Sequence, residues 1–187
     1  MPRKPKPPPP PSVRQGYVEE GVAGYYRRHA ADYRNPHEAI IAASLAELVA
    51  RQGVLPSPIL DLACGSGEVT LALEALGARD VTGVDPYTGP AYHARTGRHA
   101  LPISFEAIAD GALADRQFAL VVCSFALHLL PASRLPGTLT ALSLIAPCLW
   151  TLSPHKRPVI RPGWGWTRSD AFTLSRVHAV AYRAGTL

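Results

Sequence analysis

Hydrophobic and polar positions divide the chain into short, largely apolar runs and longer stretches in which apolar residues recur every three or four positions. The first clear pair lies in PILDLACGSGEVTLALEALGA, residues 58–78. The run 59–63 has the character of a buried strand, and 69–76 has helical spacing. A turn with two glycines, Gly65 and Gly67, separates them. We therefore expect a strand, a tight loop and a helix whose free N–H groups face the end of the strand.

The rest of the pattern predicts two more helices and five more strands. Asn35 as N-cap, Pro36 in the first helical position and Gly53 after the last turn frame an apolar stripe that predicts a helix over 36–52. A second helix is predicted at 139–146. Strands are predicted at 80–86, 101–110, 118–127, 148–153 and, as a single last strand, about 173–183.

Strands that are apolar on both faces and alternate with helices are typical of a parallel sheet that helices cover on both sides. The pattern therefore predicts an α/β fold of the Rossmann-like, doubly wound type, a three-layer sandwich. Its sheet is expected to be mostly parallel, with one late antiparallel strand. In such sheets ligands bind beyond the carboxyl ends of the strands.

Composition divides the chain into a tail and one domain. Of the net charge of +5, Arg3, Lys4, Lys6 and Arg14 contribute four, so the rest of the chain is close to neutral. Residues 1–17, with five consecutive prolines, are predicted to be a disordered basic tail, and 18–187 a single domain. A nearly neutral domain makes nucleic acid an unlikely partner.

Other classes find little support in the sequence. No apolar run reaches the about 20 residues of a membrane span, and no secretory leader is apparent, so we expect a cytoplasmic protein without a membrane partner. Cys64, Cys123 and Cys148 form no CxxC pair, and we expect no metal site. Nothing in the pattern indicates an oligomeric state.

The glycine loop is a candidate nucleotide site. A dinucleotide fingerprint needs a third glycine where this chain has Thr70, and the Walker pattern is absent. The segment resembles motif I of class I S-adenosylmethionine-dependent methyltransferases, in which a strand with an acid runs into a glycine-rich loop. Asp61 to Gly67 matches it, except that Ala63 stands where the first glycine is usual.

A second acid follows at the spacing expected of a ribose ligand. Asp85 ends the next predicted strand, 18 residues after Gly67, and is followed by Pro86. Its carboxylate could accept hydrogen bonds from both ribose hydroxyls, although an acid before proline also forms plain turns. As a ribose ligand it is expected to lack structural partners, so that Asp85→Ala leaves the apo fold intact.

The resemblance extends over about residues 24–183, to a subgroup of small, uncharacterised microbial and fungal methyltransferases. It implies S-adenosyl-L-methionine as cofactor, Asp61 reaching the cofactor's amino group through water or the loop, Asp110 near the adenine amino group, and a lid that includes Tyr33. Ala119 departs from the acid common at the start of the fourth strand. The expected cofactor-binding residues are Asp61, Ala63, Cys64, Gly65, Gly67, Asp85, Pro86, Asp110, Ser124 and Tyr33.

Two histidines are the catalytic candidates, because each follows a strand that should end beside the cofactor. His128 follows the fourth strand and His155 the fifth. Helix packing is the alternative role of His128. The segment His155-Lys156-Arg157 is either a solvated basic loop or a site for an acidic or phosphorylated substrate.

The sequence thus favours methyl transfer from S-adenosylmethionine to a small-molecule acceptor. No quartet typical of nucleic-acid methyltransferases follows the fourth predicted strand, which supports that choice. A nicotinamide-dependent oxidoreductase remains an alternative, because it would use the same loop and acid. So does a non-catalytic binding module, to which Ala63, Ala119 and the short C-terminal region point.

Overall fold

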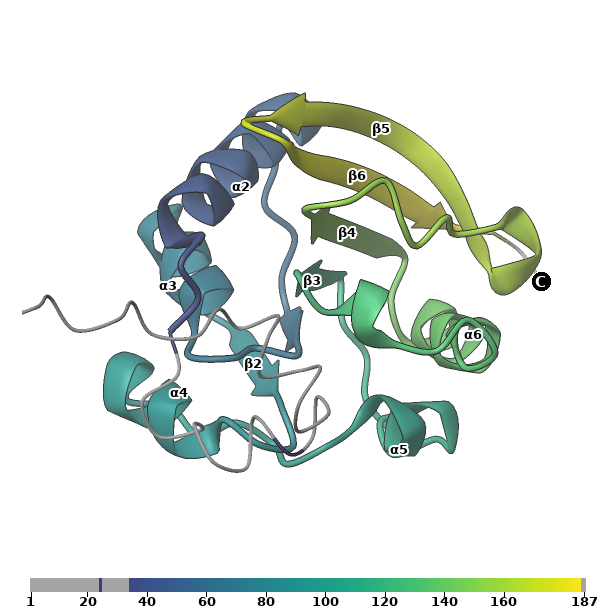
Figure 1. Ribbon diagram of the computed structural model, residues 1–187, viewed down its shortest axis with the longest axis horizontal. Coiled ribbons are helices and arrows are strands. Elements are labelled where there is room, and N and C mark those ends of the chain that lie inside the picture. Colours follow the sequence, from purple (N-terminus) through teal and green to yellow (C-terminus); the bar gives the residue numbers. More distant parts are fainter. Residues whose placement is uncertain (1–23, 25–33, 186–187) are drawn as a thin grey trace, which may run out of the picture.

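The structure is a computed structural model that describes residue 24 and residues 34–185. The predicted tail and lid residue Tyr33 lie outside these residues. The core of the described part is one twisted sheet with the strand order β2-β1-β3-β4-β6-β5 (Figure 1). Its strands are β1 (Ile59–Leu62), β2 (Val81–Val84), β3 (Leu120–Ser124), β4 (Cys148–Ser153), β5 (Trp166–Leu174) and β6 (Val177–Ala184).

Four strands are parallel, because each is joined to the next through a crossover that returns the chain to the same edge of the sheet. Strand β6 runs antiparallel between β4 and β5. The helices are α2 (Glu38–Gln52), α3 (Glu68–Ala75), α4 (Gly89–Thr96), α5 (Phe105–Ala109) and α6 (Leu135–Ile145), with the 3-10 turns η1 (Leu127–Leu129) and η2 (Pro162–Trp164).

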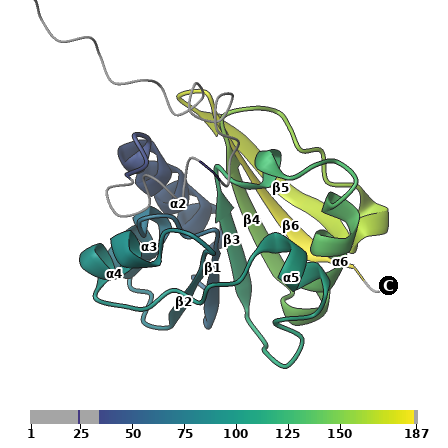
Figure 2. The same ribbon diagram turned by 60° about the horizontal axis from the view of Figure 1, so that its bottom comes forward.

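Helices cover both faces of the sheet, which confirms the predicted three-layer α/β fold (Figure 2). On one face, Ile41 and Leu45 of α2 and Leu73 of α3 pack against strand residues such as Leu120 and Trp150. On the other face, α5 and α6 bury Ile108, Leu139 and Leu142 against Val121 and Leu149. Neighbouring strand residues enter opposite cores, as the alternation of side chains along a strand requires.

The predicted strand at 101–110 is wrong. Only Leu101 pairs with the sheet, through an isolated parallel bridge to Val84. Pro102 lacks the N–H group that would continue the ladder. Ser104 then caps a helix, since its side chain accepts a hydrogen bond from the N–H group of Ala107.

The C-terminal region also differs from the prediction of one antiparallel strand. Strands β5 and β6 form a long hairpin, joined by Ser175 and Arg176. Both turn residues have positive φ, 45° and 72°, a conformation in which glycine or asparagine is usual. Without such a residue the turn had no sequence signature. The antiparallel pair is therefore complete, and the C-terminal region is not shortened.

Helix boundaries agree with the predictions within a few residues. Helix α2 begins at Glu38 rather than Pro36, with His37 in the N-cap position, and Asn35 accepts a hydrogen bond from the N–H group of His37 ahead of the helix. Gly53 ends this helix in the left-handed conformation, as expected. Helix α6 begins at Leu135, four residues before its predicted start.

Candidate active site

A pocket of about 260 Å³ lies at the carboxyl ends of β1, β2 and β3, where the doubly wound fold places ligands. We call it the first pocket. Loops after these three strands supply most of its wall, and α2, α3 and α5 supply the rest. Of the ten predicted cofactor residues, six line it: Ala63, Cys64, Gly65, Asp85, Pro86 and Ser124.

The glycine loop owes its shape to left-handed backbone conformations. Ala63, Gly65 and Gly67 have φ values of 57°, 54° and 91°. Gly67 is the N-cap of α3 rather than a lining residue, and a Cβ there would lie 2.5 Å from Cγ2 of Thr96. Glycine at this position therefore allows α4 to pack against the loop. Ala63, which stands where motif I usually has its first glycine, thus has a positive φ, a conformation in which glycine is usual.

Asp85 has structural partners that the sequence did not indicate. Its Oδ1 accepts hydrogen bonds from the N–H groups of Tyr87 and Thr88, at 2.8 and 2.9 Å, and its Oδ2 accepts one from Gly65 at 3.3 Å. The carboxylate thus holds the turn after β2 and ties it to the glycine loop. The expectation that Asp85 has no partners in the apo fold is wrong. The side chain still borders the first pocket and is 9% exposed.

Asp61 lies beneath the first pocket and is not part of its lining. It is 1% exposed, and its Oδ2 accepts hydrogen bonds from the N–H and hydroxyl groups of Thr70, at 3.1 and 2.7 Å. The Thr70 hydroxyl also contacts the Tyr92 hydroxyl at 3.0 Å. Burial raises the pKa of Asp61 to about 7 in spite of the Thr70 hydrogen bonds. Asp61 thereby joins β1 to the start of α3.

Glu68 is a pocket residue that the sequence reasoning missed. Its Oε1 accepts hydrogen bonds from the Ser66 hydroxyl, from the N–H group of Asn35 at 3.0 Å and from Arg95 at 2.9 Å. Arg95 also pairs with Glu38, so the network joins α2, α3 and α4 around the loop. The sequence signal that could have identified Glu68 is its position directly after Gly-Ser-Gly. An acid there lies in the first turn of the helix that follows the loop, where it also stabilises that helix.

Helix α5 supplies the remaining wall. Ser104, Phe105 and Glu106 line the first pocket, whereas Asp110 is exposed at the end of the helix and is not among the lining residues. The strand predicted here would have presented Asp110 at its carboxyl end. The helix that forms instead presents its first turn, which holds Glu106.

Acidic side chains line the first pocket. Among the described residues, Glu68, Asp85 and Glu106 line it and no lysine or arginine does, although Arg95 pairs with Glu68 at 2.9 Å. A site lined by carboxylates favours cations and hydroxyl groups over phosphates. This argues against the pyrophosphate of a nicotinamide dinucleotide.

Comparison with known proteins identifies the family. Residues 59–145 match the model of a methyltransferase domain. The uncharacterized protein C17A5.05c of Schizosaccharomyces pombe is 31% identical, and the match covers 94% of this chain and 93% of that protein. The chain belongs to the class I S-adenosylmethionine-dependent methyltransferases. The predicted resemblance is confirmed, and the family decides against the oxidoreductase and non-catalytic alternatives.

Solved structures agree with the fold of this methyltransferase. The N-methyltransferase NodS of Bradyrhizobium japonicum WM9, solved with S-adenosyl-L-homocysteine, superposes with a TM-score of 0.64 at 16% identity, covering 92% of this chain and 96% of that one. Magnesium protoporphyrin IX methyltransferase (ChlM) of Synechocystis PCC 6803, solved with S-adenosylmethionine, gives a TM-score of 0.61 at 17% identity, covering 92% and 95%.

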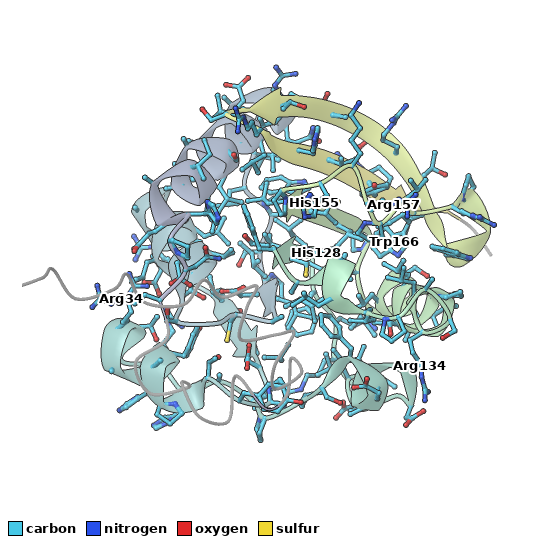
Figure 3. The ribbon with its side chains drawn as sticks, viewed as in Figure 1. Arg34, His128, Arg134, His155, Arg157 and Trp166 are labelled. Carbon is cyan, nitrogen blue, oxygen red and sulfur yellow. The ribbon has the colours of Figure 1, made fainter. Side chains whose placement is uncertain are left out.

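The methyltransferase has a second pocket, of about 610 Å³, which contains both predicted catalytic histidines. The rings of His128, on η1, and His155, after β4, meet edge to face with centroids 5.6 Å apart (Figure 3). Burial, together with the charge of His155, lowers the pKa of His128 below its ordinary value. Among the described residues, the buried Nδ1 of His128 has no hydrogen-bond partner. The structure thus brings together two residues 27 positions apart, but not in the first pocket.

Among the described residues, no helix is both long and apolar enough to cross a bilayer. Over the same part of the chain, no three side chains of the metal-ligating kinds gather closely enough to hold an ion.

Proposed function

We propose that this methyltransferase binds S-adenosylmethionine in the first pocket and transfers its methyl group to a small molecule in the second pocket. One observation carries the proposal above the others. The acid at the end of β2, Asp85, lies beside the loop that follows β1, in a pocket whose described lining residues include three carboxylates and no lysine or arginine. The cofactor carries a sulfonium, an ammonium group and two ribose hydroxyls, all of which a carboxylate attracts or accepts hydrogen bonds from.

The pocket wall suggests how the cofactor is held. Asp85 would accept hydrogen bonds from the ribose hydroxyls with the lone pairs that the turn leaves free. The backbone after β1, from Ala63 to Gly65, would border the methionine portion, with Asp61 and Thr70 keeping the loop in place. Phe105 and Glu106 are better situated for the adenine than the exposed Asp110. The roles of Asp61, Asp110 and the lid residue Tyr33 toward the cofactor remain predictions.

The transfer itself is an in-line displacement. A lone pair of the acceptor attacks the methyl carbon, the carbon–sulfur bond breaks, and its electron pair stays on sulfur as the neutral thioether. The protein's main contribution is to hold the two reactants at attack distance. An acceptor O–H or N–H must also lose a proton, and we assign that proton to the neutral imidazole of His128, with His155 beside it.

The three cysteines are buried and unpaired, which fits a reducing compartment such as the cytoplasm.

Calorimetric titration tests the cofactor proposal. We expect the protein to bind S-adenosylmethionine and S-adenosylhomocysteine, and not NADH. Asp85→Asn keeps one acceptor oxygen for the turn but loses the charge, so it should weaken binding about 10- to 100-fold. Asp115→Asn, at an exposed acid outside both pockets, is the matched control and should bind like the wild type. Thermal melting of each variant separates a binding defect from unfolding.

Absence of binding of both cofactor forms at millimolar concentration would overturn the proposal. Unchanged affinity in a folded Asp85→Asn variant would leave Asp85 with its turn-forming role alone.

A further inference from the structure

The second pocket lies between the sheet and the loop that follows β4. Its floor belongs to the same face of the sheet that α5 and α6 cover elsewhere. Three neighbouring strands contribute to this floor through residues in adjacent register positions: Thr151 of β4, Val180 of β6 and Ala171 of β5. The loop that carries His155 forms its roof (Figure 3). At about 610 Å³ it is within the range of cavities that hold small molecules, about 300–1,000 Å³.

One turn of chain separates the two pockets. In η1 and the residues beside it, Leu127 and His128 line the second pocket, whereas Ala126, Leu129 and Leu130 line the first. A molecule in the second pocket is therefore separated from the first pocket by this single 3-10 turn.

The charges of the second pocket are opposite to those of the first. Among the described residues, Lys156, Arg157 and Arg168 line it, and no aspartate or glutamate does. Within the described part of the chain, none of these three cations forms an ion pair. Cations that are not neutralised by the protein's own acids are available for an anionic ligand.

Two local features keep acids away and hold the cations in place. A bulge in β5 at Ser169 puts Arg168 on the pocket side of the sheet, while Asp170 pairs with Arg51 on the opposite side at 3.7 Å. The roof loop is tied to β4 through Ser153, whose hydroxyl donates to the carbonyl oxygen of Arg157 at 2.9 Å and accepts from the N–H group of His155 at 3.2 Å.

We propose that the second pocket is the acceptor site and that it selects an acceptor bearing a carboxylate or a phosphate group, which Lys156, Arg157 and Arg168 bind. This inference rests on the proposed function, because only the cofactor in the first pocket makes the neighbouring pocket an acceptor site. The anion would lie over β5 and the roof loop, so that the reacting group of the same molecule extends toward η1 and His128. The apolar side chains Val159 and Ile160 would hold the body of the acceptor.

The test uses the labelled full-length protein, saturated with S-adenosylhomocysteine, in NMR titrations at constant ionic strength. The probes are sodium benzoate, sodium phosphate and the neutral benzamide. The ring resonances of His128 and His155 and the indole resonance of Trp166 report on the pocket, since all three residues line it. We expect saturable shifts with benzoate, with phosphate or with both, and none with benzamide. The anion that binds identifies the group carried by the acceptor.

Charge-removing variants make the test specific. Arg168→Gln, and Lys156→Gln combined with Arg157→Gln, should each weaken binding of the anion about tenfold or more. Arg116→Gln, which removes an equal charge from an exposed site outside the pocket, should leave the affinity unchanged. All variants should retain the wild-type affinity for S-adenosylhomocysteine.

Shifts that are equal for benzoate and benzamide, or anion affinities unaffected in both pocket variants, would overturn the inference while cofactor binding stands. No shift with either anion would overturn it as well. If S-adenosylhomocysteine itself does not bind, the proposed function fails, and the acceptor role fails with it, whatever the anions do.

Discussion

Asp61 shows how a motif acid can act on a site without touching it. Its carboxylate is buried under the glycine loop, and one oxygen receives both hydrogen bonds that Thr70 can donate. The other oxygen, Oδ1, has no partner among the described residues. A buried carboxylate with one unsatisfied oxygen is costly to ionise, which is the physical reason that its pKa is about 7. The buried Asp61 carboxylate, which positions α3 through Thr70, therefore has a free-energy cost that depends on pH.

We therefore expect the stability of the protein to fall as the pH rises from about 4 to about 7. Between the unfolded pKa of 3.8 and the folded pKa of about 7, the folded state holds a proton that the unfolded state has lost. The free energy of unfolding should decline across this window by up to about 4 kcal/mol, and this contribution should be constant above it. Asp61→Asn cannot ionise but still offers Thr70 an oxygen, so its decline should be absent. Urea unfolding at a series of pH values measures the decline in the wild type and its absence in the variant.

The comparison of interest is the difference between variant and wild type, because other groups titrate in the same range. Asp115→Asn, at an exposed site, should follow the wild-type pH profile. A profile for Asp61→Asn parallel to that of the wild type would mean that Asp61 is ionised at low pH in the folded protein.

Residues of the site could be predicted where their role follows from the strand–loop–helix pattern. Gly65, Asp85 and Ser124 follow strand ends, and all three line the first pocket. Glu68 was missed because its role depends on Arg95, which is 27 positions away and belongs to another helix. Asp85 was predicted as a ligand alone, since hydrogen bonds to the backbone of its own turn leave no mark on sequence spacing.

The elements themselves were predictable where apolar periodicity was long, and not where a short polar signal decided. Residues 148–153 were predicted within their bounds because both faces of β4 are buried. Residues 101–110 carry apolar side chains, yet Pro102 and the capping Ser104 turn most of them into a loop and helix. The β5–β6 hairpin escaped prediction because its turn residues, Ser175 and Arg176, are not typical of a tight turn with positive φ.

One contact between elements can be tested with a matched pair of glycines. Gly165 ends η2 with φ of 87°, and a Cβ there would lie 2.2 Å from Oγ of Ser143 on α6. Gly165→Ala must therefore adopt a strained backbone and also displace α6, so we expect a loss of about 2–4 kcal/mol in the free energy of unfolding. Gly163→Ala, two residues earlier, meets no atom within 4 Å and should change stability by less than about 0.5 kcal/mol.

Urea unfolding followed by circular dichroism gives both values. Equal effects of the two substitutions would show that the junction of η2, β5 and α6 can move to accommodate a methyl group, and that the hairpin is loosely attached to the helix layer.

At the scale of the whole molecule, the two pockets lie next to each other along one edge of the sheet, and side chains of opposite charge line them. Among the described residues, three carboxylates line the first pocket, one of them paired with Arg95, and three cations line the second. A cationic cofactor and an anionic acceptor would each enter the pocket of opposite charge and attract one another across η1. Transfer removes the positive charge from sulfur, so this attraction is weaker between the products than between the reactants. The arrangement favours binding of the reacting pair and release of the products.

The net positive charge of the chain, in contrast, belongs mainly to its first fourteen residues, which lie outside the part that the structure describes. Arg3, Lys4, Lys6 and Arg14 carry four positive charges, and residues 1–14 contain no acid, so deletion of 1–14 changes the net charge from +5 to +1. The lining residues of both pockets that the structure describes lie between positions 35 and 182. We expect the truncated protein to bind S-adenosylhomocysteine with wild-type affinity in calorimetry but to elute from heparin at lower salt, because fewer cations are available to a polyanion.

A full-length variant with these four residues changed to glutamine separates charge from the proline run, and it should elute like the truncated protein. A loss of cofactor affinity beyond about tenfold on truncation, about 1.4 kcal/mol, would instead mean that the first fourteen residues help to build the site.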